Sequence, residues 1–106
     1  MRHVSLDHPA PCSQDLRPRL ARLTRHLRAR LLDFGPGGPQ VRSADQAQGR
    51  VEAAFPGHDT AQVLSALARC GVSAAREGDE AVFWLTPDTP FEDLDYVWGC
   101  LFDILG

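Results

Sequence analysis

Residues 71–106 read GVSAAREGDEAVFWLTPDTPFEDLDYVWGCLFDILG, and this stretch decides the fold of the chain. Alternation that starts at Val72, together with the short apolar run at 81–85, predicts two strands. Gly78-Asp79 lies between them as a hairpin turn, in which glycine supplies the positive φ. We therefore expect a β-hairpin followed by a helix that runs to the end of the sequence.

The predicted C-terminal helix begins near residue 90. Thr89 is placed to cap it, Pro90 suits the first helical position, and Glu92 completes a capping box. Apolar side chains recur at helical spacing and acids fall on the opposite side. The apolar set is Phe91, Leu94, Trp98, Leu101, Phe102 and Leu105, and the acidic set is Glu92, Asp93, Asp95 and Asp103. One face is thus expected in the core and the other in solvent.

A long amphipathic helix is predicted upstream, over residues 14–34. Apolar residues advance along it by three and four positions and form one narrow stripe: Leu16, Leu20, Leu23, Leu27, Leu31 and Phe34. Pro18 fits only in a first turn, so regular helix is expected from about Arg17. Four arginines point away from this apolar stripe: Arg17, Arg22, Arg25 and Arg28. They form either a solvated face or a set of partners for the acids of a neighbour.

The remaining segments alternate between irregular and regular structure. Residues 1–13 show no periodicity and are predicted to be a flexible N-terminal arm, and the polar stretch 35–48 a mobile connector. Residues 50–55 alternate as a short strand. Asp59 is expected to cap a helix that Gly71 ends. The predicted order is helix, strand, helix, strand, strand, helix.

This order predicts an α+β fold. Its sheet is expected to be small, three-stranded and mainly antiparallel, with helices packed on one face. At 106 residues the chain is long enough for one modest core, so residues 14–106 are expected to form a single domain after the arm at 1–13.

The two halves of the chain carry opposite charge. Residues 1–50 contain nine arginines and four acids, and residues 51–106 contain two arginines and ten acids. The halves are complementary and can pair within one chain or across a dimer. We expect no nucleic-acid partner, because the acidic half would repel phosphate.

Cysteine usage and hydropathy favour a cytoplasmic protein without a metal site. Three widely spaced cysteines give neither a disulfide framework nor a zinc motif, and His3, His8 and Cys12 have no ligand-like spacing. The sequence shows neither an apolar stretch of membrane-spanning length nor a secretory signal, so no membrane partner is expected.

The strand at 81–85 is the candidate interaction surface. It is apolar on both faces, with Ala81, Phe83 and Leu85 on one side and Val82 and Trp84 on the other. If helices cover a single face of the sheet, the second face exposes an aromatic or aliphatic patch, unless the N-terminal helix or the connector covers it. The candidate interface residues are Val82, Phe83, Trp84 and Leu85, since a few aromatic side chains dominate such surfaces.

The order of features resembles a known family. The features are the helix with Leu16 to Leu31, the Pro/Gly connector, RVEAAF at 50–55, PGHD at 56–59, LARCGV at 67–72, the hairpin, and TPFEDLD at 89–95. In this order they resemble the small C-terminal domain of fold-type I pyridoxal-phosphate enzymes, the aminotransferase and cysteine-desulfurase-like group. The resemblance covers residues 14–106 and implies that domain's α+β fold without the large catalytic domain.

The same resemblance implies a departure in chemistry. In that group a lysine of the large domain forms a Schiff base with the cofactor, and this sequence contains no lysine. The second hairpin strand of the group commonly carries an arginine for the substrate carboxylate. Here Phe83 or Trp84 stands in that region, and Arg76 on the preceding strand is a poor replacement for it.

No other catalytic constellation is visible. His58 beside Asp59 is a weak candidate for a general base with its orienting acid, because the carboxylate of a capping Asp is committed to backbone donors. The acids Asp93, Asp95 and Asp103 suit a helix N-terminus or a solvated face better than a cation site.

The sequence therefore favours a non-catalytic domain, without cofactor, that acts through protein association, as a homodimer or by docking on a larger protein. The alternative is a regulatory module that binds a small molecule such as an amino acid or pyridoxal phosphate, with Arg76 holding a carboxylate.

Overall fold

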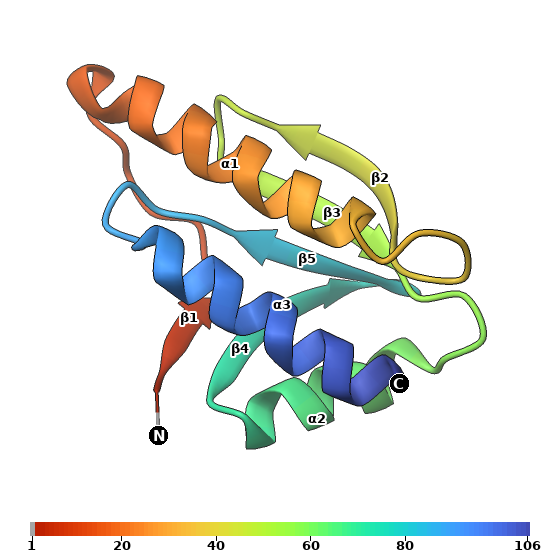
Figure 1. Cartoon of the computed structure of the whole chain (residues 1–106). Helices are drawn as coiled ribbons and strands as arrows, with labels where there is room; N and C mark the ends of the chain where they lie inside the picture. The colour runs from red at the N-terminus through yellow and green to blue at the C-terminus, as the bar shows by residue number, and fades with distance from the viewer. Residues whose placement is uncertain (1) are drawn as a thin grey trace.

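The computed structural model describes residues 2–106, and Figure 1 shows it as a sheet with helices packed against it. Its helices are α1 (Arg17–Leu32), α2 (Thr60–Arg69) and α3 (Phe91–Leu105), with a 3-10 turn at Gln14–Leu16 before α1. Its strands are β1 (Val4–Leu6), β2 (Gln40–Asp45), β3 (Arg50–Ala54), β4 (Val72–Glu77) and β5 (Glu80–Trp84). The predicted α+β class and the predicted helices and hairpin are confirmed.

The sheet has five strands in the order β1-β4-β5-β3-β2, so the prediction of three strands was wrong. The central strands β4, β5 and β3 are antiparallel neighbours, as the hairpin required, and β2 adds an antiparallel edge. β1 adds the other edge in parallel with β4. The sheet is therefore mixed.

Strand β1 lies within residues 1–13, where we expected a flexible arm. Val4 pairs with Val72 and Leu6 with Ala74, and the side chains of Val4 and Leu6 are buried. Three residues are too few to show a period, so no strand signal is visible in this segment. The start of the chain is thus part of the sheet.

Strand β2 lies within the predicted mobile connector. Its side chains are mostly exposed, because it is an edge strand that borders solvent. A polar, exposed edge strand lacks the alternation of a half-buried one, and this explains the missed prediction.

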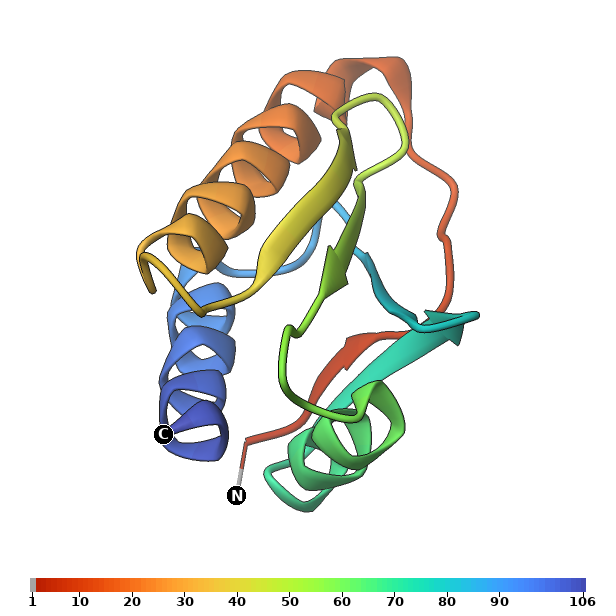
Figure 2. The same ribbon diagram turned by 90° about the vertical axis from the view of Figure 1, so that its right-hand side faces the viewer.

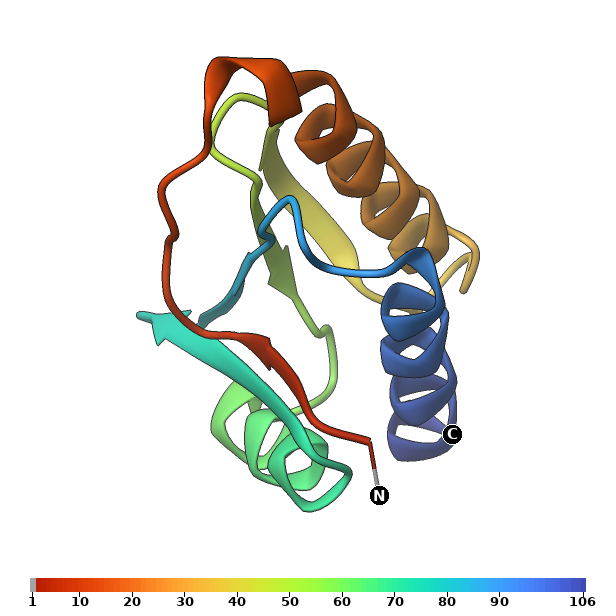
Figure 3. The same cartoon turned by 90° about the vertical axis from the view of Figure 1, so that its left-hand side faces the viewer.

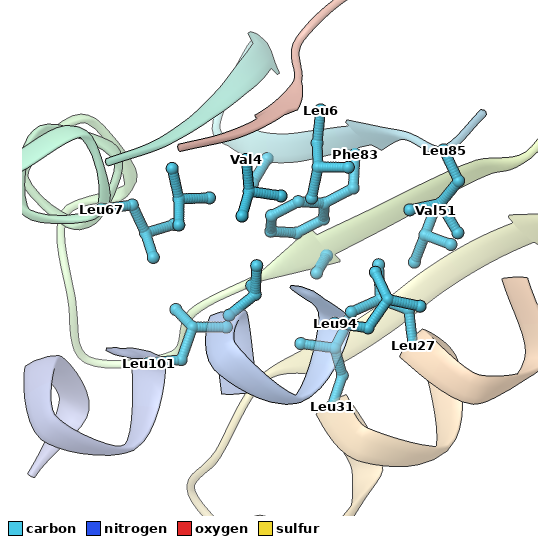
Figure 4. Close-up of a cluster of buried hydrophobic side chains, with 14 of the residues drawn as sticks. Val4, Leu6, Leu27, Leu31, Val51, Leu67, Phe83, Leu85, Leu94 and Leu101 are labelled. Atoms are coloured by element: carbon cyan, nitrogen blue, oxygen red, sulfur yellow. The ribbon is translucent and has the colours of Figure 1, made fainter. Parts of the chain in front are cut away.

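All three helices cover one face of the sheet. Figures 2 and 3 show α1 and α3 side by side against the strands, and α2 packs on β4 and α3. Four leucines of the predicted stripe are buried on α1, as are Leu94 and Leu101 on α3; the four are Leu20, Leu23, Leu27 and Leu31. Leu16, which precedes α1, is 42% exposed. Figure 4 shows the buried side chains around Phe83 of β5, Leu85 after it, and Val4 and Leu6 of β1.

The helix starts were predicted with mixed success. Asp59 caps α2 by accepting a hydrogen bond from the Ala61 N–H at 3.3 Å, as expected. The capping box at α3 was wrong, because the helix starts at Phe91 and Pro90 occupies the cap position. The Thr89 hydroxyl, which was expected to cap α3, accepts instead from the Thr86 N–H at 3.2 Å and so stabilises the turn before the helix.

Candidate association surface

The predicted interface residues lie almost entirely inside the monomer. Phe83 and Leu85 belong to the core that the helices cover, with exposed fractions of 0% and 1%. Val82 is also 0% exposed, although alternation places it on the opposite face. Of the four residues, Trp84 alone has accessible surface, and it is half-buried. The core position of Phe83 and Leu85 rules them out as contact residues of the folded chain.

Charged side chains cover the face of the sheet opposite the helices. Arg50 pairs with Glu52 and, at 2.8 Å, with Glu77, and its guanidinium lies 5.3 Å from the centre of the Trp84 ring. These groups come from three adjacent strands, and Glu52 is the cross-strand partner of Val82. The apolar patch expected on this face is therefore replaced by a polar network.

Arg76, the predicted carboxylate ligand, is exposed near the end of β4, opposite Ala81 in the hairpin. Its guanidinium makes no ion pair within residues 2–106. The role in ligand binding stays a prediction. His58 is exposed, and the neighbouring Asp59 carboxylate is engaged with the helix backbone.

An aromatic cluster lies instead on the helical layer, where the ends of α1 and α3 meet. Phe34, Trp98 and Phe102 have ring centres 5.6 to 6.1 Å apart, and the Arg30 guanidinium lies 4.8 Å from the Trp98 ring centre. The Phe102 side chain is 58% exposed, the largest exposure among the large apolar residues. We call Phe34, Trp98 and Phe102, with the adjacent Gly99, the aromatic patch.

Sequence reasoning placed Trp98 and Phe102 in the core. The buried residues of α3 are Leu94, Val97, Cys100 and Leu101, and Trp98 and Phe102 each follow one of them by one position. One position is about 100° around a helix, so the two aromatic residues lie at the border of the core face. One signal in the sequence could have shown this. The apolar face of the helix is wider than a helix needs to pack on one side, so residues at its border are left partly exposed.

Gly99 opens the outward side of α3. It lies in the middle of the helix, and a Cβ built on it would meet nothing within 4 Å. Hollows of about 380 and 290 Å³ flank Phe102, one lined by Trp98, Gly99 and Asp103 and the other by Phe34 and Leu105. A glycine here costs about 1 kcal/mol of helix stability relative to alanine and leaves room for close approach of another backbone.

Among the described residues, unpaired charges of opposite sign lie on α1 and α3. Arg22 on α1 and Glu92 and Asp103 on α3 are exposed and make no ion pair in the part of the chain that the structure describes. α1 and α3 run in the same direction, since Arg19 contacts the residues before α3 while Phe34 contacts Phe102. Within the described chain, the helical layer thus presents an unpaired arginine on α1 beside unpaired acids on α3.

Asp95 joins these two helices. Its carboxylate lies 2.8 Å from His26 Nε2 and accepts a hydrogen bond from Arg30 Nε at 2.9 Å. The hydrogen bond with His26 and the interactions with Arg30 lower the pKa of Asp95, against a partial desolvation that raises it. These two contacts with α1 therefore hold α3 in position.

Replacing Asp95 with asparagine should reduce stability at neutral pH by at most about 1 kcal/mol, because the site is partly exposed and screened. A carboxyl group with a lowered pKa stabilises the fold above its unfolded pKa of about 3.9, and this contribution is lost as pH falls through the folded pKa. Urea unfolding at pH 7 and pH 3 measures it. The gap between wild type and Asp95→Asn should be larger at pH 7; equal gaps would contradict this role.

Two thiols meet near the α2–α3 contact. The Tyr96 hydroxyl donates to the Cys70 carbonyl at 2.5 Å, and burial, followed by a hydrogen bond with Cys70, raises the pKa of the Cys100 thiol. A raised pKa favours the protonated form of this thiol. The Tyr96–Cys70 hydrogen bond connects the end of α2 to α3.

Within residues 2–106 the structure contains no group of three or more histidine, cysteine or acidic residues placed to hold a metal ion. None of its described helices combines the length and the apolar character needed to cross a membrane.

Comparison with known proteins bears on the fold. No protein-family model and no curated protein matches the sequence. Among solved structures, the chain is similar to a NifS-like protein, with a TM-score of 0.75 and 13% sequence identity. The match covers 86% of this chain but only 28% of that one. The chain therefore has the fold of one part of a NifS-like protein, which supports the predicted fold relationship and, at this identity, nothing beyond the fold.

Proposed function

We propose that this chain is a non-catalytic domain that acts by protein association, and that its partner is a second copy docked on the aromatic patch. The observation that carries the proposal is the 58% exposure of Phe102 on top of Trp98 and Phe34. Exposed, clustered aromatic side chains are typical of the centres of protein interfaces. The lack of lysine in the sequence supports the absence of Schiff-base chemistry.

Charge complementarity favours a second copy over an unrelated partner. A two-fold axis along the groove between α1 and α3 would place α1 of one chain over α3 of the other. Arg22 would then face Glu92 of the partner, twice per dimer, because both lie near the starts of their helices. The aromatic patches would meet near the axis, where Gly99 allows the helices to approach closely. This arrangement uses charges that lack ion-pair partners within residues 2–106.

The direct test is the solution mass by light scattering behind a sizing column. We expect twice the 11.6 kDa of one chain, with a dimer that weakens as salt rises, because surface charges are screened. A monomer across micromolar to millimolar concentrations would overturn the proposal of self-association.

The Gly99→Ala variant separates folding from association. Alanine in an exposed helix interior should stabilise the monomer by about 0.5–1 kcal/mol, since the added Cβ meets no atom. The same methyl group should weaken the dimer about tenfold if helices approach each other there, which corresponds to about 1.4 kcal/mol. Thermal unfolding and sedimentation equilibrium measure the two effects. A stabilised variant with unchanged dimerisation would place the contact away from Gly99.

A further inference from the structure

A second surface feature lies on the other side of α1, between this helix and the edge strand β2. A hollow of about 440 Å³ is lined there by Arg25 and Arg28 of α1 and by Arg42 of β2. The rest of its lining is Val41, Ser43, Ala44 and Gln46. We call it the arginine hollow. Its lining residues thus include three arginines, one serine and one glutamine, and no acidic residue.

Most of the positive charge in this hollow is uncompensated. Arg28 makes no ion pair with any described residue, and Arg25 donates only to the neutral Gln46 amide oxygen, at 3.2 Å. Arg42 is the exception, because its Nε lies 3.7 Å from the Glu80 carboxylate and its guanidinium is thus directed across β3 toward β5. One oxygen of the nearby Asp45 carboxylate, Oδ1, accepts from N–H groups of its own turn, at 3.0 and 3.1 Å.

A β-bulge contributes to the hollow. Val41 pairs with Ala53 and Ser43 with Glu52, so Arg42 is the extra residue of β2. Bulges redirect side chains and are common at sheet edges and beside binding sites. β2 is also the edge of the sheet, so one side of its backbone is free of strand partners. The backbone irregularity is thus located where the arginines gather.

We propose that the arginine hollow binds the phosphate group of a small anion. A phosphate carries nearly two negative charges and three terminal oxygens, whereas a carboxylate has one charge and two oxygens. Planar guanidinium groups pair with phosphate through two parallel hydrogen bonds, and those of Arg25 and Arg28 are available for it. The neutral Ser43 and Gln46 can complete the contacts. This inference does not depend on association, because α1 meets β2 on the side away from α3.

Isothermal titration with inorganic phosphate and pyrophosphate, and with acetate at equal ionic strength, tests the inference on the full chain. We expect phosphate and pyrophosphate to bind and to raise the Tm, as ligand linkage requires, and acetate to bind at least about tenfold more weakly. Loss of one charge-assisted contact in Arg28→Gln should weaken phosphate binding about tenfold.

Arg17→Gln is the matched control, since Arg17 is an exposed arginine of α1 outside the hollow and without a described ion pair. It should bind phosphate like the wild type. Equal losses in the two variants would mean diffuse attraction to a basic helix and would overturn the site. No heat and no Tm shift with any of the three anions, or acetate binding as tightly as phosphate, would also overturn it.

Discussion

A Phe102→Asp variant is expected to be a folded monomer at concentrations where the wild-type chain is a dimer. Truncation of an aromatic interface residue typically costs 2 kcal/mol or more, and a symmetric dimer contains two copies of the change. The aspartate would also place a charge between two aromatic patches, where it has no partner. We therefore expect the dissociation constant to rise by roughly 1000-fold or more.

The variant should keep its fold, because Phe102 is 58% exposed and lies outside the core. An added acid in the last turn of α3 opposes the helix dipole by about 0.3–1 kcal/mol, a small part of the 5–15 kcal/mol typical of a domain. Circular dichroism and thermal unfolding check that the fold is intact. Light scattering at several concentrations reports the mass.

Trp84→Asp distinguishes the two faces of the domain. It changes the one predicted interface residue that retains accessible surface, on the sheet face opposite the helices. We expect this variant to remain dimeric. A monomeric Trp84→Asp together with a dimeric Phe102→Asp would move the interface to the sheet and contradict the proposed use of the helical layer.

The elements predicted from the sequence are those with a strong local signal. α1 and α3 have sustained helical periodicity, Asp59 supplies a local cap for α2, and Gly71 and Gly78 take the positive φ that ends a helix and turns a hairpin. β1 and β2 lack such signals. One is three residues long, and the other is a mostly exposed edge strand of which only Val41 and Ala44 pack against the core. β1 is fixed by pairing with β4, which is distant in sequence, and β2 by pairing with the next strand, β3. Patterns within a single segment detect neither pairing.

The candidate surface was harder to predict for the same reason. Alternation correctly separated Val82 and Trp84 from Phe83, yet the exposure of that face depended on Arg50 and Glu77, which come from other strands. The exposure of Phe102 likewise depends on the position of Phe34, which follows the end of α1 and contacts the Phe102 ring. Periodicity shows that a helix has an apolar face, while the neighbouring elements decide which edge of it stays in solvent.

The Leu6→Ala variant measures how much the start of the chain contributes to the fold. A flexible arm would tolerate this change without loss of stability. In the structure, Leu6 is 0% exposed, pairs with Ala74 of β4, and lies beside Phe83 in the core (Figure 4). Truncation of a buried leucine leaves a cavity and typically costs 2–5 kcal/mol. We expect this loss in urea unfolding and a Tm lower by roughly 10 °C or more.

Leu16→Ala is the matched control for Leu6→Ala, because it makes the same change at a leucine that is 42% exposed. We expect it to alter stability by no more than about 0.5 kcal/mol, as is usual for surface positions. Both variants are compared at one protein concentration, since dimerisation also stabilises the folded state. Equal, small effects would mean that β1 is not an integral strand. A large effect at Leu6 alone would show that three residues with no sequence signal complete the core by closing one edge of the sheet.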